Sequence, residues 1–324
     1  MKTYLLLPHI RIHNANAMGS PYIIGFPPMT AWLGAAHALQ RKLKNDYPDF
    51  RVEQLGISCH SFDLQVYRSE GDRYNSLIGT ANPLKKSRKT GEYERPPFIE
   101  EARCHLEISL LLEVQGVSPE NEQIVCQAVY DRLLTMKMAG GDIEGIGAKN
   151  RSRWQVFYVP DDDQAEQRKV LHTLMPGYVL IERRGLLCQR QKADIPDLLG
   201  TMPTQLDLFQ VNSDVYDPLS MMLQHLSVTY SYDGTTWQGK RKEKGWLVPI
   251  SVGFRSITAL GNVQEQRDSD TLHCFAESVM TLGEFKMPYR FGNVAEIMWH
   301  YEYLSEQGLY LCRNENNDGR NIDG

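Results

Sequence analysis

The segment from Met138 to Trp154 combines glycines with cations. It reads "MAGGDIEGIGAKNRSRW", with four glycines within eight positions and then Lys149, Arg151 and Arg153 within five. Backbone N–H groups in a glycine-rich segment can approach a phosphate closely, and Lys and Arg side chains supply the opposite charge. The segment can therefore bind a phosphate, either of a nucleotide cofactor or of a nucleic-acid backbone.

A nucleotide cofactor does not match this pattern. Its glycine loop has the form G-x-G-x-x-G or G-x-x-x-x-G-K-[ST] between a strand and an opening helix. Here Asn150 stands where a third glycine belongs, and the segment follows an expected helix, whose end carries partial negative charge. Two interpretations stay open: a helix C-cap at Gly140 and Gly141, or a glycine elbow against a phosphodiester. We expect no cofactor.

Metal and nucleophile motifs are also absent from the sequence. There is no HExxH, CxxC or GxSxG, and His9 and His13 would lie about 13 Å apart along a strand. We therefore expect no metal site.

A metal-free ribonuclease remains the alternative, because a His near a glycine loop can deprotonate a 2′-hydroxyl. Its candidates are His13, His37 and His60, although a single His more often has a structural role.

Two further clusters interleave cations with aromatic residues. One is "WQGKRKEKGW" at 237–246, and the other lies at 85–98, with Lys85, Lys86, Arg88, Lys89 and Arg95 beside Tyr93 and Phe98. Cations for phosphates and aromatic rings for unpaired bases are the two components of single-strand recognition, although a charged run is more often a solvated loop. The net charge is −5, so any nucleic-acid surface must be a local patch on an acidic protein.

The first half of the chain alternates strands and helices. We expect strands at 4–13 (interrupted near Pro8), 52–67, 104–114 and 154–159, and helices at 29–43 and 118–138, the second capped by Ser118 with Pro119 at its first position. An excursion at 68–103 separates the second and third strands. The order β, α, β, insertion, β, α, β predicts a ferredoxin-like arrangement.

The acidic segment at 160–167 marks a boundary between two regions. We expect strands at 177–183 and 245–254 and helices at 271–282 and 293–304 in the second. The predicted fold class is α+β: a ferredoxin-like (RRM/RAMP) core at 1–160 with an inserted thumb hairpin at about 68–103, followed by a mixed α/β region at 161–324 that packs on it.

Composition indicates a protein with a large core that does not enter membranes. The 324 residues are 42% hydrophobic and 23% charged, and the longest apolar runs fall far short of the roughly 20 residues of a membrane span. The six cysteines occur singly, which is typical of free thiols in a reducing compartment. We expect a cytoplasmic protein.

Several motifs in order along the chain resemble one known family. They are "HNANAMGSP", "GFPPMTAWLGAAHALQR", "ISCHSFDLQV", "NPL", "EEARCHLEISLLL", "MAGG", "PGYVLI", "GWLVPI" and "RD" at 267–268. Together they resemble the Csy-type small subunit of the type I-F CRISPR surveillance complex, a Cas-five-like member of the RAMP superfamily. The resemblance covers nearly the whole chain.

That resemblance implies a non-catalytic subunit of an antiviral complex. Such a subunit binds the 5′ handle of the CRISPR RNA, pairs with the large subunit and caps the backbone filament, while a separate endoribonuclease cuts the precursor. Contact with target double-stranded DNA stays open. The family's glycine-rich loop maps to Gly140 and Gly141, and its most distinctive block holds Arg11, Asn14 and Asn16. Lys149, Arg151 and Arg153 match no family motif, so their roles rest on chemistry alone.

The expected RNA-binding residues are therefore of three kinds: residues of the resembling motifs, the cations of the insertion, and the cations after the glycines. They are Arg11, Asn14, Asn16, Lys85, Lys86, Arg88, Lys89, Gly140, Gly141, Lys149, Arg151, Arg153 and Arg267. The exposed apolar residues Tyr22, Ile23 and Phe26 are expected either to contact a partner or to pack locally.

Overall fold

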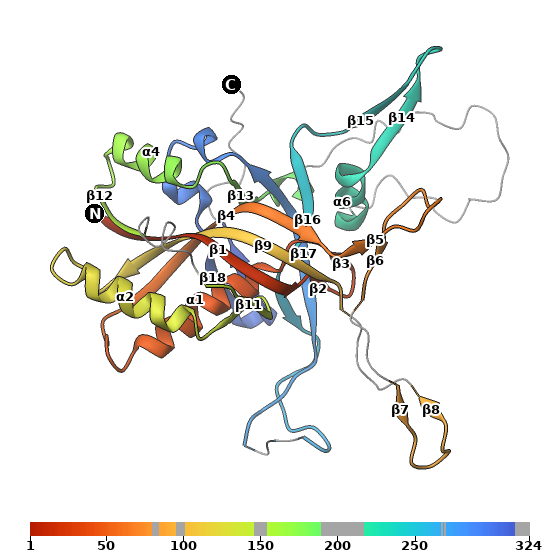
Figure 1. Cartoon of the computed structure of the whole chain (residues 1–324), viewed down its shortest axis with the longest axis horizontal. Helices are drawn as coiled ribbons and strands as arrows, with labels where there is room; N and C mark the ends of the chain where they lie inside the picture. The colour runs from red at the N-terminus through yellow and green to blue at the C-terminus, as the bar shows by residue number, and fades with distance from the viewer. Residues whose placement is uncertain are drawn as a thin grey trace.

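One antiparallel sheet runs through both halves of the chain. The computed structural model describes residues 1–79, 84–94, 101–145, 154–188, 217–266, 268 and 270–314. Within these residues eleven strands join in the order β10-β11-β1-β9-β4-β13-β17-β16-β19-β18, and β12 also pairs with β1 (Figure 1). The fold is thus mixed α and β, built on a large curled sheet. The division at residue 160 stays a prediction.

The first half follows the predicted order. Its elements are β1 (Lys2–Asn16), β2 (Met18–Ser20), β3 (Ile23–Ile24), α1 (Met29–Leu43), β4 (Arg51–Leu64), β9 (Arg103–Gln115), α2 (Glu122–Leu133), β10 (Lys137–Met138), β11 (Gly141–Ile143) and β12 (Gln155–Val159). The insertion holds two small hairpins, β5 (Val66–Tyr67) with β6 (Ser76–Leu77) and β7 (Lys85–Lys86) with β8 (Tyr93–Glu94).

The second half extends the same sheet. Its elements are α4 (Gln164–Thr173), β13 (Tyr178–Glu182), α5 (Gly185–Cys188), α6 (Pro218–Leu226), β14 (Val228–Tyr232), β15 (Trp237–Arg241), β16 (Trp246–Ser256), β17 (Ala276–Lys286), β18 (His300–Leu304) and β19 (Leu309–Arg313), with short 3₁₀ turns between β17 and β19. Trp299 joins the halves: it pairs with Leu55, and its Nε1 donates to the Leu180 carbonyl at 2.8 Å.

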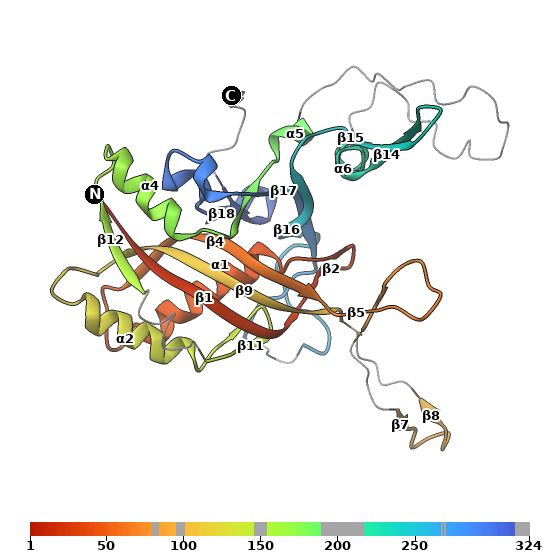
Figure 2. The ribbon, with the colours of Figure 1, turned by 45° about the horizontal axis from the view of Figure 1, so that its top comes forward.

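Two cores cover opposite faces of the sheet. Leu5 and Leu7 of β1 pack into the larger core with Trp32 of α1, whereas Tyr4 and Leu6 point to a smaller core under α4. Figure 2 shows α4 on one side of the sheet and α2 on the other. The connector residues Ile23 and Phe26 are buried, so they pack locally, while Tyr22 is exposed.

Three predicted helices differ from the structure. The helix expected at 118–138 begins at Glu122 with Asn121, not Ser118, at the N-cap position, and it ends at Leu133. The segment 271–282 becomes strand from Ala276, because β17 pairs with β16 over ten positions. The segment 293–304 holds a 3₁₀ turn at Val294–Ile297 and then β18, which pairs with β19 over five positions. Their apolar spacing matched a helix, but long-range strand pairing outweighs such local preferences.

The described residues contain no helix with the length and apolarity needed to cross a membrane. Cys59, Cys104, Cys126, Cys274 and Cys312 are free thiols.

Candidate nucleic-acid interface

Helix α4 covers only part of its face of the sheet. The uncovered part of the same face carries a row of polar side chains. In β1 the register against β9 shifts between Leu7 and Ile10, and His9 has a φ of 53°. The shift changes the alternation, so Ile10 and Ile12 continue the buried series begun by Leu5 and Leu7. The opposite face of β1 then carries the polar side chains of His9, Arg11 and His13. We call these residues the polar row, together with their neighbours His105, Glu107 and Ser109 of β9 and His60, Ser61 and Asp63 of β4.

The buried end of the polar row is a histidine pair. The rings of His9 and His60 stack with centroids 4.3 Å apart. His9 Nδ1 lies 2.7 Å from the Glu107 carboxylate, and His60 Nε2 lies 2.7 Å from the Ser109 hydroxyl. Burial first, and then the neighbouring His9, lowers the pKa of His60 to about 4, against the opposing effect of Glu107. His60 is therefore neutral at pH 7 and has a structural role, as a single His often has.

The exposed end of the row surrounds Asn14. The rings of His13 and His105 lie 4.4 Å apart. The Asn14 backbone N–H donates to His105 Nδ1 at 3.2 Å, and Asn14 Oδ1 accepts from Gln65 Nε2 at 3.2 Å. Asn14 has a φ of 58°, a left-handed conformation that Asn adopts more readily than most residues, at a second register shift of β1. Asn14 is thus fixed at a bend with its side chain at the surface.

A shallow cavity of about 320 Å³ lies along this row. Its lining comes from β1, β4, β9 and the residue after β11, and consists of Arg11, Ile12, His13, Ser61, Asp63, His105, Leu106, Glu107 and Glu144. Arg11 faces three carboxylates there and already lies 3.6 Å from Glu107. The cavity floor therefore favours hydrogen-bond donors, such as the amino groups of bases, over phosphates.

Gly140 lies in a hairpin turn beside Asn16, and Gly141 begins the strand that follows the turn. β10 and β11 turn through Ala139 and Gly140, whose φ values are 49° and 76°. The Asn16 backbone N–H donates to the Ala139 carbonyl at 2.8 Å. The C-cap interpretation of Gly140 and Gly141 is therefore wrong, because α2 ends at Leu133 and the glycines belong to a strand pair.

Gly141 serves close packing against β1. A Cβ at this position would lie 2.7 Å from the His13 carbonyl oxygen and 2.8 Å from the Ala15 nitrogen. Arg103 lies beside the same turn: a Cβ on Gly140 would be 3.8 Å from its Nη1, and Arg103 Nη2 pairs with Glu101 at 3.0 Å. Sequence analysis did not select Arg103, which lies within the quoted motif "EEARCHLEISLLL".

The insertion leaves the sheet at one end of the polar row and returns there. The last residue of β4, Leu64, pairs with Cys104 of β9, and the Gln65 backbone N–H donates to the Arg103 carbonyl at 2.9 Å. The β7–β8 hairpin stands away from the sheet in Figures 1 and 2. Its exposed cations are Lys85, Lys86, Arg88 and Lys89.

The predicted residues thus fall into three groups. The structure brings Arg11, Asn14, Asn16, Gly140 and Gly141 together at the end of β1, and it places the four insertion cations on a separate hairpin. Lys149, Arg151, Arg153 and Arg267 lie outside the described residues. The segment that holds the first three joins β11 to β12, two strands that pair along the same edge of β1.

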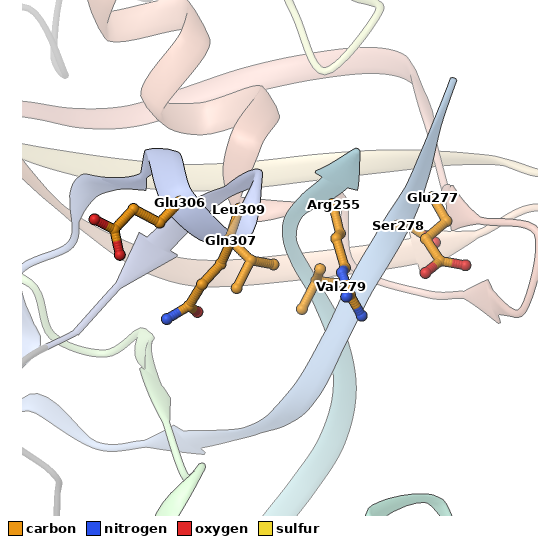
Figure 3. Close-up of a pocket in the computed structure, with 7 residues that line it drawn as sticks. All are labelled: Arg255, Glu277, Ser278, Val279, Glu306, Gln307 and Leu309. Atoms are coloured by element: carbon orange, nitrogen blue, oxygen red, sulfur yellow. The ribbon is translucent and has the colours of Figure 1, made fainter. Parts of the chain in front are cut away.

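A larger cavity of about 720 Å³ lies near the far end of the sheet. Strands β16 and β17 and the turn before β19 line it with Arg255, Glu277, Ser278, Val279, Glu306, Gln307 and Leu309 (Figure 3). The lining contains one cation and two carboxylates but no imidazole or thiol. We therefore place the candidate site on the polar row.

Thiol and metal chemistry find little support in the described part of the chain. Burial raises the pKa of the Cys59, Cys104 and Cys312 thiols to about 12, so these groups are protonated at pH 7 and poor nucleophiles. No group of three or more His, Cys, Asp or Glu side chains is placed there to hold a metal ion.

Comparisons with known proteins agree over most of the chain. A family model described as "CRISPR-associated protein (Cas_Csy2)" matches residues 5–312. The CRISPR-associated protein Csy2 of Pseudomonas aeruginosa (strain UCBPP-PA14) is 32% identical over 319 residues, which cover 94% of this chain and 93% of that protein.

Substitution of Gly141 tests the close packing of the hairpin on β1. Because an added Cβ would meet backbone atoms that cannot move aside cheaply, we expect Gly141→Ala to lower the free energy of unfolding by about 1–3 kcal/mol. Gly145→Ala is the matched control, since nothing lies within 4 Å of its Cβ position. Urea unfolding measures both variants; equal midpoints would contradict the proposed packing.

Acidification tests the burial of His60. Its pKa is about 4 in the folded chain and about 6.5 in the unfolded chain, so below pH 6.5 the unfolded state binds more protons. Stability present above pH 6.5 is therefore lost as the pH falls toward 4.

We expect His60→Gln to reduce the loss of unfolding free energy between pH 7 and pH 5 by about 1 kcal/mol, a figure that allows for partial solvent access of the ring. The exposed His37 on α1 provides the control, His37→Gln. Urea unfolding at each pH gives the two slopes. Parallel curves for wild type and His60→Gln would show that another group causes the pH dependence.

Proposed function

The chain belongs to the Csy2 family of CRISPR-associated proteins, and from this membership we propose that it is a non-catalytic, RNA-binding subunit of a type I-F CRISPR complex. In this proposal it works in the cytoplasm and binds the 5′ handle of the CRISPR RNA. It also pairs with the large subunit and caps the filament of backbone subunits as a Cas-five-like member of the RAMP superfamily.

One observation carries the proposal: the four-cation hairpin is inserted between β4 and β9, two of the strands that carry the polar row. β4 and β9 pair up to Leu64 and Cys104, and the insertion begins and ends at this point. An RNA strand that is bound in the polar row would therefore leave the row at the base of the insertion. Lys85, Lys86, Arg88 and Lys89 could then neutralise the phosphates that follow.

The strand order supports a ferredoxin-like core. Strands β12, β1, β9 and β4 lie side by side, each pair antiparallel, and they follow the chain order 4-1-3-2 of a split βαβ unit. Helices α1 and α2 contribute Trp32 and Val129 to one core on one face. The other face keeps its polar row, as a nucleic-acid platform requires.

The polar row and the cations have different roles in this proposal. The carboxylates of Asp63, Glu107 and Glu144 would accept hydrogen bonds from base amino groups, and the side chain of Asn14 offers both donors and an acceptor. Phosphates would be neutralised at the rim by the cations of the insertion. The acidic remainder of the protein can face basic surfaces of its partner subunits.

Salt dependence tests the role of the insertion. If about six phosphates are bound, the logarithm of the affinity for repeat RNA falls with the logarithm of salt concentration at a slope of roughly −4. Joint substitution of Lys85, Lys86, Arg88 and Lys89 by Ala should flatten this slope by about 3. The reason is that four phosphates of the RNA then keep their counterions on binding. Fluorescence anisotropy with labelled repeat RNA measures the slope.

The matched control removes four exposed cations, namely Arg41 and Lys42 of α1, Lys44 directly after α1, and Lys169 of α4. This control should leave the slope unchanged, because both helices lie away from the insertion (Figure 1). An unchanged slope in the insertion variant would remove the hairpin from the RNA path.

The alternative function is a metal-free endoribonuclease. Among the histidines, His13 with its neighbour His105 is the better candidate for its catalytic base. The two rings lie 4.4 Å apart at an open cavity, whereas His60 is held by Ser109 and His37 lies on α1. Incubation with labelled repeat RNA in EDTA distinguishes the functions. We expect intact RNA; a discrete cut that His13→Ala abolishes would establish the endoribonuclease instead.

A further inference from the structure

The β14–β15 hairpin presents three exposed aromatic side chains on one face. In an antiparallel pair, directly opposed residues share a face. Tyr232 is opposite Trp237, and Tyr230 is opposite Gly239, so the three rings lie on the same side of the hairpin. Tyr230 is 66% exposed, Tyr232 56% and Trp237 70%. A soluble protein rarely leaves three large rings together at its surface without a partner.

The rings form an extended surface. A Cβ on Gly239 would lie 3.1 Å from a ring carbon of Tyr230, so the Tyr230 ring lies over the glycine with its outer face to solvent. The rings of Tyr232 and Trp237 lie 5.4 Å apart. Two neighbouring aromatic surfaces of this kind can each accept one base.

Local bonds hold this surface in place. The Asp233 carboxylate accepts hydrogen bonds from the Thr235 and Thr236 backbone N–H groups at 2.9 and 2.8 Å, and one from Gln238 Nε2 at 2.7 Å. These bonds lower the pKa of Asp233, first through the two backbone groups. At the other end, Lys242 Nζ donates to Gln224 of α6 at 3.1 Å.

Charge identifies the class of partner. Residues 228–246 contain four cations, Lys240, Arg241, Lys242 and Lys244, against two acids, Asp233 and Glu243. Arg241 lies on the aromatic face opposite Val228, and Lys240 lies on the reverse face opposite Thr229. An anionic partner with exposed flat apolar surfaces fits this arrangement. A paired duplex hides its base faces, whereas an unpaired strand offers both bases and phosphates.

We propose that the aromatic face of the β14–β15 hairpin is a stacking site for unpaired bases of a single-stranded polynucleotide, separate from the polar row. The β14–β15 and β7–β8 hairpins project on different sides of the sheet in both views (Figures 1 and 2). The polar row lies on β1, β9 and β4, whereas the β14–β15 hairpin lies between α6 and β16 in the chain, so the site can bind a second stretch of nucleic acid while the polar row is occupied. Stacking does not read the 2′-hydroxyl, so RNA and DNA strands bind alike.

Binding of short oligonucleotides to the full-length chain tests this proposal. We compare a fluorescein-labelled 12-nucleotide oligo-dT with an abasic strand of the same length, which keeps the phosphates but lacks the bases. Wild type should bind oligo-dT more tightly. In the double variant Tyr230→Ala, Trp237→Ala the affinity for oligo-dT should fall about 5- to 100-fold, and that for the abasic strand should change less than about twofold.

Two control variants separate stacking from other effects. Tyr230→Phe with Trp237→Phe keeps flat rings and should retain oligo-dT binding within about threefold. Tyr22→Ala with Tyr74→Ala removes two exposed rings elsewhere and should have no effect. Oligo-dT should also quench a part of the tryptophan fluorescence that Trp237→Phe removes. Oligo-U, the RNA arm, should bind within a few-fold of oligo-dT.

Three outcomes would overturn the proposal. Wild type binding both strands equally would show that bases are not read, and equal losses for both strands in the alanine variant would indicate a charge or folding effect. Unchanged oligo-dT binding together with lost association with a partner subunit would make this face a protein interface. The comparison is repeated in the variant that lacks Lys85, Lys86, Arg88 and Lys89. A loss of oligo-dT binding on Tyr230→Ala with Trp237→Ala that persists in this background is independent of the insertion, so failure of the proposed function is distinguished from failure here.

Discussion

The two breaks in the alternation of β1 determine which of its side chains form the polar row. Residues at positions 5 and 7 point to the large core, and after the shift at Pro8 and His9 positions 10 and 12 do so, followed by 15 and 17 after the shift at Asn14. A strand without the first break would bury His9 and Arg11 in that core. Burial of unpaired polar side chains is costly, so the bulge and the polar row depend on each other.

The same strand supports the neighbouring parts of the site. β1 is bonded to β9 on one edge and to β11 and β12 on the other. Gly141 allows β11 to approach β1 at the second break, where Asn14 turns outward and Asn16 bonds to Ala139. The insertion leaves β4 beside this break. A polar surface, a tight hairpin and the base of the insertion therefore meet at one point, although they come from distant parts of the sequence.

Local patterns predicted the elements of the first half well, and for identifiable reasons. Helix α1 matches its prediction from Met29 to Leu43, because its apolar residues recur at helical spacing and its end is rich in cations. The strand prediction at 104–114 is also confirmed, within one residue at each end. The apolar residues of β17 fit a helix as well as a strand, and only its pairing with β16, distant in the sequence, decides the structure.

The site was harder to predict than the elements. The motifs around Asn14 and Gly140 pointed to residues that the structure brings together at the end of β1, but only the register of the β10–β11 hairpin shows the structural role of the glycines. Arg103 and His105 looked like ordinary residues of a strand, since nothing local shows that β1, β9 and the insertion meet beside them. The acidity of the cavity was equally hidden, because Asp63, Glu107 and Glu144 belong to three separate segments.

That acidity separates this surface from a general phosphate-binding patch. A cleft lined by Lys and Arg would hold any polynucleotide through its backbone and would discriminate little between sequences. Here Arg11 is offset by the adjacent Glu107, and the cations of the insertion stand on the β7–β8 hairpin away from the sheet. In the proposed function, carboxylates, imidazoles and amides in the row discriminate among base edges, while the cations of the insertion supply charge. A net negative protein would in this way bind RNA selectively, because attraction and recognition are performed by different parts of the fold.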